Sequence, residues 1–131
     1  MRNCEIINNL EVLKTFDKYK LPVSIMWKIS KNRKALEDIY KIYNEQRIQI
    51  IKAYANQTED GNIMEENGNP IFTDESTRQK CLKAVDELFL QDNEEITLSK
   101  IKLDDLLSCD NDRYDPLDIV HINALSFMIE E

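Results

Sequence analysis

The side chains of this chain that could do chemistry lie mainly in its last quarter. Four aspartates follow one another at short spacing: Asp110, Asp112, Asp115 and Asp118. Carboxylates at such spacing could hold calcium, but an EF-hand loop needs a glycine at its sixth position and a glutamate at its twelfth. Here those positions are Asp115 and His121. We therefore expect a solvated loop that caps a helix, and no metal site.

His121 is the only histidine and the second candidate for chemistry. Cys109 and Asp118 are near enough in sequence to form a cluster with it, but their spacing fixes no geometry for a general base or a nucleophile. The chain has only two glycines, and it has no phosphate-binding loop, dinucleotide fingerprint or nucleophile elbow. We expect a protein that is not an enzyme and binds no cofactor, with His121 packed or exposed in a helix.

Charge is distributed unevenly along the sequence. Up to Tyr54 there are eleven Lys/Arg and six Asp/Glu, and from Ala55 onward there are six and nineteen. Lys28, Lys31 and Lys34 recur at a spacing that places them on one side of a helix, where they could meet phosphates. The chain is acidic as a whole, however, and no helix-turn-helix or base-stacking motif is present. Direct binding to nucleic acid is therefore not expected.

Carboxylates dominate the second half of the chain. Asp104, Asp105, Asp110 and Asp112 are prominent among them. Such residues could imitate the phosphates of nucleic acid, and an inhibitor of a DNA-binding enzyme can work in this way through charge-steered encounter. The other interpretation is that they only keep the chain in solution. Both interpretations stay open.

Aromatic residues of the central segment offer a third candidate surface. Aromatic side chains on an exposed helix are typical of interfaces, although packing against a neighbouring helix is their more common use. Together with the charged residues above, they complete the set predicted to bind a partner: Trp27, Lys31, Lys34, Tyr40, Tyr43, Asp104, Asp105, Asp110 and Asp112.

The elements that must position these side chains are mostly helical. Apolar residues at three- and four-residue spacing predict helices over residues 4–19, 22–55, 75–91 and 116–129. Pro22 suits the first position of the second helix, and Asp115 suits the cap of the last one. At 1.5 Å per residue the second helix would span roughly 50 Å, so it must either protrude or bend.

Two short β elements are expected beside the helices. Both glycines lie in residues 58–73, where Asp60-Gly61 and Asn67-Gly68 predict a turn or a small hairpin. Alternation of apolar residues predicts a strand over residues 95–101. We expect one mainly α (α+β) domain over residues 1–131. In it, a long central helix packs with two or three shorter helices and a small β-hairpin or short-strand element.

No segment is typical of export or of a membrane span. The start, "MRNCEIINNLEVLK", has no uninterrupted apolar stretch, and the longest apolar runs are too short to cross a bilayer. The three cysteines, Cys4, Cys81 and Cys109, have neither metal nor redox spacing, and are expected to be free thiols. These features predict a cytoplasmic protein that does not associate with membranes.

Four segments follow one another in a recognisable order: "LPVSIMWKISKNRKALEDIYKIYNEQR", "EDGNIMEENGN", "AVDELFLQDNEEITLSKIKLDDL" and "LSFMIEE". This order resembles a family of small proteins encoded by tailed phages and prophages of low-GC Gram-positive bacteria. In that family an "LP" start leads to a long helix with a "KN" pair, and a "DENG"-type turn and an "EEL" helix follow. The resemblance covers most of the chain from Leu21, but "CDNDRYDPLD" departs from the pattern.

The resemblance brings no catalytic residues with it, but it implies a phage or prophage setting in the cytoplasm of a bacterial host. We therefore expect a non-enzymatic accessory protein that binds another protein, either a structural or assembly component or a host factor. The alternative hypothesis is an acidic, anti-defence inhibitor of a host nucleic-acid enzyme. The long helix could also join copies of the chain in a homo-oligomer.

Overall fold

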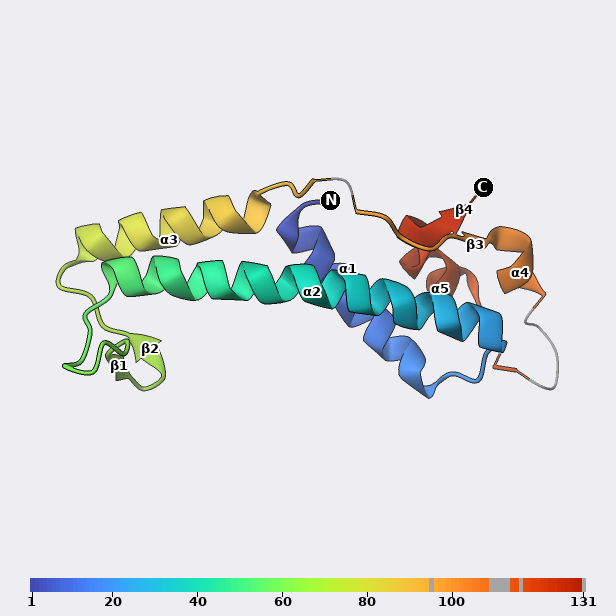
Figure 1. The fold of residues 1–131 in the computed structure, drawn as a ribbon, viewed down its shortest axis with the longest axis horizontal. Coiled ribbons are helices and arrows are strands. Elements are labelled where there is room, and N and C mark those ends of the chain that lie inside the picture. The colour runs from blue at the N-terminus through green and yellow to red at the C-terminus, as the bar shows by residue number, and fades with distance from the viewer. Residues whose placement is uncertain (95, 109–113, 116, 131) are drawn as a thin grey trace.

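One long helix runs through the computed structural model, which describes residues 1–94, 96–108, 114, 115 and 117–130 (Figure 1). The α-helices of the described residues are α1 (Asn3–Thr15), α2 (Val23–Tyr54), α3 (Glu75–Leu90), α4 (Leu103–Leu107) and α5 (Ile119–Ala124). In Figure 1, α3 runs antiparallel beside the second half of α2, α1 crosses its middle, and α4 and α5 lie near its start. The predicted class, mainly α with small β elements, is confirmed.

Helix α2 agrees with the predicted helix 22–55 to within one residue at each end. Neither glycine nor proline interrupts it, and its 32 residues span about 48 Å. Pro22 is its N-cap rather than its first residue. Of the two expected alternatives, protrusion is the one observed, because the second half of α2 extends away from the C-terminal elements with only α3 and a hairpin beside it (Figure 1). We call residues 40–90 the arm and the remaining described residues the head.

The hydrophobic core lies in the head. Its buried members come from α1, from the connection between α1 and α2, from the first half of α2 and from the C-terminal elements: Ile6, Leu10, Leu13, Phe16, Leu21, Ile25, Ile29, Leu36, Ile101, Leu106, Leu125 and Met128. In the arm the buried apolar side chains are Tyr43, Ala55, Cys81 and Leu88. A pair of helices buries less surface than several packed layers, so the arm depends on fewer apolar contacts than the head.

Helix α1 ends earlier than the predicted helix 4–19, because the chain tightens into a 3-10 turn, η1 (Phe16–Lys18). Arg2 is the N-cap of α1, and Asn3 lies buried inside the first turn. Its side-chain amide donates to the carbonyl of Leu88 at 2.7 Å and accepts from the amide of Asn93 at 2.8 Å. These bonds fasten the start of α1 to the end of α3.

The glycine-containing segment 58–73 forms the predicted hairpin. Strand β1 (Glu65–Glu66) pairs antiparallel with β2 (Asn69–Pro70), and both turn residues have positive φ, 54° at Asn67 and 80° at Gly68. This is the conformation that an Asn-Gly hairpin turn requires. A two-stranded hairpin is marginal alone. Here it is supported from the end of α2, where the N–H of Asn56 donates to the carbonyl of Ile71 at 2.8 Å.

The predicted strand 95–101 is wrong in extent. Strand β3 is only Ile101–Lys102, and it pairs in parallel with β4 (Ile129–Glu130); residue 95 lies outside the described residues. The residues just before β3 are held by a side chain instead of a strand. The amide of Asn32 on α2 donates to the carbonyl of Ser99 at 2.8 Å and accepts from its N–H at 2.7 Å. One buried asparagine thus satisfies the backbone groups that a neighbouring strand would otherwise pair.

The predicted C-terminal helix 116–129 is also wrong in extent. Asp118, not Asp115, caps α5, and its carboxylate accepts from the N–H of His121 at 3.0 Å. Asp115 is used elsewhere: its carboxylate accepts from the N–H of Lys20 at 2.6 Å, and its own N–H donates to the Lys20 carbonyl at 2.8 Å. Residue 116, which follows Asp115, lies outside the described residues.

Helix α5 ends at Ala124, and a 3-10 turn, η2 (Ser126–Met128), leads into β4. Leu125 and Met128 are both fully buried, and Ile129 pairs with Ile101. A tighter turn brings residues three apart onto the same side. The chain therefore leaves the α-helix where it places two apolar side chains in the core and then starts a strand.

Asp74 caps α3 and provides a pH-dependent test of the fold. Its carboxylate accepts from the N–H of Thr77 at 2.7 Å, and this bond lowers the pKa of Asp74 below its ordinary value. Because the pKa is lower in the folded chain, the stabilisation is complete above the pKa of the unfolded chain and is lost as the pH falls through the folded one. We expect Asp74→Ala to lower the urea midpoint of unfolding at neutral pH. The midpoint of this variant should also fall less than that of the wild type when the pH is lowered.

The matched variant is Asp74→Asn, because asparagine retains the acceptor that caps the helix but does not titrate. Its midpoint at neutral pH should stay near that of the wild type. On acidification its midpoint should fall less than that of the wild type, as for Asp74→Ala. Circular dichroism in urea at neutral pH and at about pH 3 measures both effects, since a carboxylate is largely protonated there. Equal midpoints for Asp74→Ala and wild type at neutral pH would contradict the assigned cap.

Candidate functional site

Helices α2 and α3 pack along a seam of apolar side chains in the arm. Tyr43 on α2 is 7% exposed, and Cys81 and Leu88 on α3 are 2% and 6% exposed. Burial raises the pKa of the Tyr43 phenol and that of the Cys81 thiol. Both groups are therefore protonated at neutral pH, and the thiol has little nucleophilic character. The seam is structural, and the surfaces beside it are the candidates for binding.

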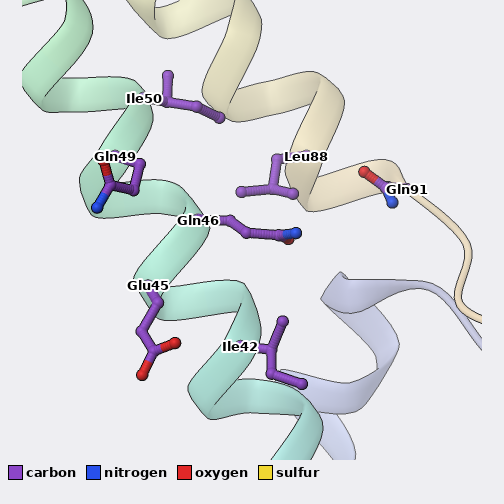
Figure 2. Close-up of a pocket in the computed structure, with 7 residues that line it drawn as sticks. All are labelled: Ile42, Glu45, Gln46, Gln49, Ile50, Leu88 and Gln91. Atoms are coloured by element: carbon purple, nitrogen blue, oxygen red, sulfur yellow. The ribbon is translucent and has the colours of Figure 1, made fainter.

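An open groove of about 550 Å³ follows one side of this seam (Figure 2). Seven residues line it: Ile42, Glu45, Gln46, Gln49, Ile50, Leu88 and Gln91. In Figure 2 the side chains of Ile42, Gln46 and Ile50 extend toward α3, whereas Glu45 and Gln49 lie on the outer side of α2. The groove thus has an aliphatic floor with amide side chains among and around it.

The groove combines exposed aliphatic surface with uncharged amides. Ile42 on its floor is 56% exposed, and this is the kind of large apolar side chain that proteins bury when a partner is present. The amides of Gln46 and Gln91 can each donate and accept hydrogen bonds, so they can pair with either kind of polar group. Glu45 is the only lining residue with a charged side chain, and the other six are aliphatic residues or glutamines.

Two of the residues predicted to bind a partner meet on the head half of α2. The ammonium group of Lys31 lies 5.0 Å from the centre of the Trp27 ring, a cation–π contact, and Trp27 is 58% exposed. Lys34, one turn further on, forms an ion pair with Asp38 at 3.0 Å, which raises the pKa of Lys34. These side chains lie on the same helix as the groove but outside its lining.

The two predicted tyrosines differ in exposure. Their rings are 6.1 Å apart, but Tyr40 is 40% exposed whereas Tyr43 is buried. Tyr43 therefore has the packing role that the sequence left open, and Tyr40 keeps a surface that a partner could contact.

The predicted acidic residues are not part of the arm. Asp104 and Asp105 are exposed in α4, at the far end of the head (Figure 1). Asp110 and Asp112 lie outside the described residues. Of the predicted set, then, the structure brings together Trp27 with Lys31 and Tyr40 with Tyr43, and it places the described aspartates elsewhere.

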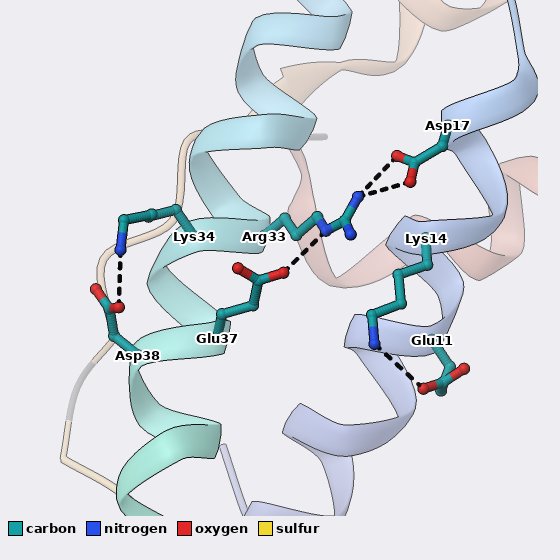
Figure 3. A network of polar contacts seen from close by, with 7 residues as sticks. All are labelled: Glu11, Lys14, Asp17, Arg33, Lys34, Glu37 and Asp38. Carbon is teal, nitrogen blue, oxygen red and sulfur yellow. Dashed lines mark hydrogen bonds and ion pairs between the residues drawn. The ribbon is translucent and has the colours of Figure 1, made fainter.

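Figure 3 shows an ion-pair network that connects η1 to α2. Arg33 donates two hydrogen bonds to Asp17, at 2.9 and 2.7 Å, and one to Glu37 at 3.0 Å. The bond to Asp17 is the main cause of the raised pKa of Arg33, and the pair with Glu37 adds to it. With Lys34 paired and Lys31 against a ring, three of the basic side chains on α2 already have intramolecular partners. This weakens the case for a phosphate-binding stripe.

His121 belongs to a second polar cluster, between α5 and the segment before α2. Its Nδ1 lies 2.9 Å from Oδ1 of Asp118, its Nε2 lies 2.8 Å from the hydroxyl of Tyr19, and its ring meets Phe16 edge-on. The bond from the backbone N–H of His121 lowers the pKa of Asp118. The cluster joins α5 to the segment between α1 and α2. Cys109, the third member of the predicted cluster, lies outside the described residues.

The described part of the chain lacks two other kinds of feature. It contains no group of three or more His, Cys, Asp or Glu that could hold a metal ion. Among the same residues, no helix combines the length and the apolar character that a membrane span needs.

The groove residues were not singled out from the sequence. Ile42 extends the apolar stripe of the long helix, and Leu88 belongs to the apolar face expected for the third helix, but such positions are normally read as core. The glutamines Gln46, Gln49 and Gln91 carry no signal of their own. Only the antiparallel pairing of α2 with α3 brings these residues to one surface.

Comparison of the chain with protein-family models, with curated proteins and with solved structures gave no match.

Proposed function

We propose that this chain is a phage- or prophage-type accessory protein that acts by binding another protein, with the groove between α2 and α3 as its binding surface. The order of the sequence segments supports the phage setting. The observation that carries the binding role is Ile42, 56% exposed on the floor of an aliphatic groove. The residues that line the groove belong to α2, to α3 and to Gln91 directly after α3, and the start of α1 lies at its Ile42 end (Figure 2).

The shape and chemistry of the groove favour a helical segment of the partner. Two antiparallel helices leave a furrow into which a third helix can pack, ridges into grooves, as in a helical bundle. Ile42, Ile50 and Leu88 would contact the large apolar side chains of such a segment, and Gln46 and Gln91 would pair with uncharged polar groups at its edges. The proposed partner is therefore a protein with an amphipathic helix whose flanks are polar but weakly charged.

The test compares two variants that place a charge at equally exposed aliphatic positions. Ile42 is 56% exposed in the groove and Leu107 is 54% exposed in α4, away from the arm. Wild type, Ile42→Lys and Leu107→Lys are immobilised and exposed to a lysate of phage-infected or prophage-induced host cells. We expect wild type and Leu107→Lys to retain the same protein, and Ile42→Lys to retain at least about tenfold less, because central apolar anchors dominate such interfaces.

A photo-crosslinking residue in place of Gln46 then locates the contact. The expected crosslink lies in an amphipathic helical segment of the captured protein, and a synthetic peptide of that segment should bind the wild type but not Ile42→Lys. Circular dichroism first establishes that both lysine variants are folded. The proposal fails if folded Ile42→Lys retains the same protein as fully as the wild type does.

A second candidate function, inhibition of a host nucleic-acid enzyme, is favoured by the charge at the end of the arm. Residues 53–77 contain no Lys or Arg, and they contain six carboxylates: Glu59, Asp60, Glu65, Glu66, Asp74 and Glu75. The same capture experiment separates the two functions. A partner attracted by this acidic surface should dissociate at about 0.5 M salt, because exposed charges are then screened, whereas a partner bound in the groove should remain.

A further inference from the structure

A second cavity, of about 540 Å³, lies in the arm and shares none of its residues with the groove. It has three sides. Helix α2 contributes Arg47 and Ile51, the hairpin segment contributes Asn69, Pro70 and Phe72, and α3 contributes Arg78, Cys81, Leu82 and Val85. A concave surface built by three separate elements is the usual setting of a small-ligand site.

The walls of this cavity are mainly apolar. Leu82 is 42% exposed, and Ile51, Phe72 and Val85 are half-buried. Cys81 is fully buried, and burial raises the pKa of its thiol, so at neutral pH it adds an uncharged group. These side chains could surround an aliphatic or aromatic group and remove its apolar surface from water.

Arg47 gives the cavity a charge. Its Nε and Nη2 both donate to the amide oxygen of Asn44, at 3.3 and 3.0 Å, which is a neutral acceptor. No ion pair involves Arg47 among the residues that the structure describes, and the residue as a whole is half-buried in the wall of the cavity. The other arginine of the cavity, Arg78, is paired with Glu75 at 2.8 Å. The guanidinium has five N–H donors, and the two bonds to Asn44 leave others for a ligand. A positive charge at the wall of a cavity, without a carboxylate partner among the described residues, favours an anionic ligand.

We propose that this cavity binds an apolar carboxylate. The carboxylate pairs with Arg47, whose planar fork of donors matches its geometry, and the apolar part of the ligand lies against Ile51, Phe72 and Leu82. The glycine-containing hairpin is then one wall of a binding site as well as a connection between helices. This site shares no residue with the groove, so its test is independent of the test of the proposed function.

Two sources share this chemistry: a free medium-chain acid, and the terminal carboxylate of a peptide with an apolar last residue. Octanoate represents the first source, and acetyl-Phe-Leu with a free carboxylate represents the second. The matched control ligands are octylamine and the amide of the same peptide, which keep the apolar part and remove the negative charge. Each is titrated into the full chain while the methyl signals of isoleucine, leucine and valine are followed by NMR.

At least one of the two acids should shift the methyl signals of Ile51, Leu82 and Val85 saturably, with its uncharged or cationic counterpart binding at least about tenfold more weakly. Arg47→Gln should lower the affinity for the acid about tenfold, which is the usual effect of losing a hydrogen bond to a charged group. Lys83→Gln removes an exposed charge from α3 outside the cavity. It should change the affinity less than about twofold, since exposed charges are well screened.

A second variant protects the test in case Arg47→Gln does not fold. Leu82→Glu, at a partly exposed position, supplies a carboxylate from within the cavity and should abolish binding of the acid by occupying Arg47. The proposal is overturned if neither acid shifts these methyl signals, if acid and control ligand bind equally well, or if folded Arg47→Gln or Leu82→Glu binds as tightly as the wild type does.

Discussion

Replacing Asn32 by alanine is expected to lower the free energy of unfolding by about 2–3 kcal/mol, because it leaves the backbone N–H and carbonyl of Ser99 without their partner. Asn32 is 1% exposed, and its amide makes both bonds, at 2.7 and 2.8 Å. The lost bonds would free the segment between α3 and β3 from α2. Urea unfolding followed by circular dichroism measures the change.

Two further variants make this experiment specific. Asn8→Ala, at an exposed position on α1, should change stability by less than about 0.5 kcal/mol, as surface substitutions usually do. In Asn32→Asp the carboxylate can still accept from the N–H of Ser99, but it also faces the carbonyl of Ser99 and repels it. Burial and the facing carbonyl should raise the pKa of this carboxyl above its ordinary value. The destabilisation should therefore shrink as the pH falls toward about 4, since the protonated acid can donate again. If Asn32→Ala is as stable as Asn8→Ala, the amide does not replace a strand.

Leu36→Ala is expected to cost about 3 kcal/mol and to lower the melting temperature by about 10 °C, through lost burial and the cavity that remains. Leu36 is 0% exposed and belongs to the core formed by α1, α2 and the C-terminal elements. Its removal would loosen the head at the point where these elements meet. Differential scanning calorimetry of the purified chain measures the loss.

The matched control is Leu90→Ala, which removes the same atoms from the end of α3, where the side chain is 54% exposed. It should lower the melting temperature by less than about 2 °C, since little apolar surface is lost. Similar losses for the two variants would contradict the place of Leu36 in the hydrophobic core.

The elements that could be predicted were those whose signals are local. Helix α2 lacks Gly and Pro from Val23 to Tyr54 and has a regular apolar stripe, so its bounds followed directly. The Asn67-Gly68 turn was equally clear, because few other pairs tolerate positive φ at both positions. The cap of α3 at Asp74 also has a local cause, since aspartate is among the residues preferred before the first turn of a helix.

The predictions that were wrong depended on contacts distant in sequence. Residues near Ser99 alternate as a strand would, but the amide of Asn32, 67 positions earlier, takes the place of a neighbouring strand. The last helix was predicted too long because Asp115 resembles a cap, whereas it binds the backbone of Lys20. Apolar periodicity and cap residues are local signals, and neither can show that a group is already paired with a remote partner.

The amino-acid sequence by itself determined the mainly helical class, the unbroken central helix, the hairpin turn and the acidic character of the segment that follows α2. These properties arise from backbone preferences and side-chain charge within a few residues. The tertiary structure alone decided that α3 runs back along α2, which creates the groove at Ile42 and leaves Arg47 in a cavity without a carboxylate partner among the described residues. The reason is physical: a binding surface depends on which side chains lie together in space, and for this chain that was set by packing between distant segments.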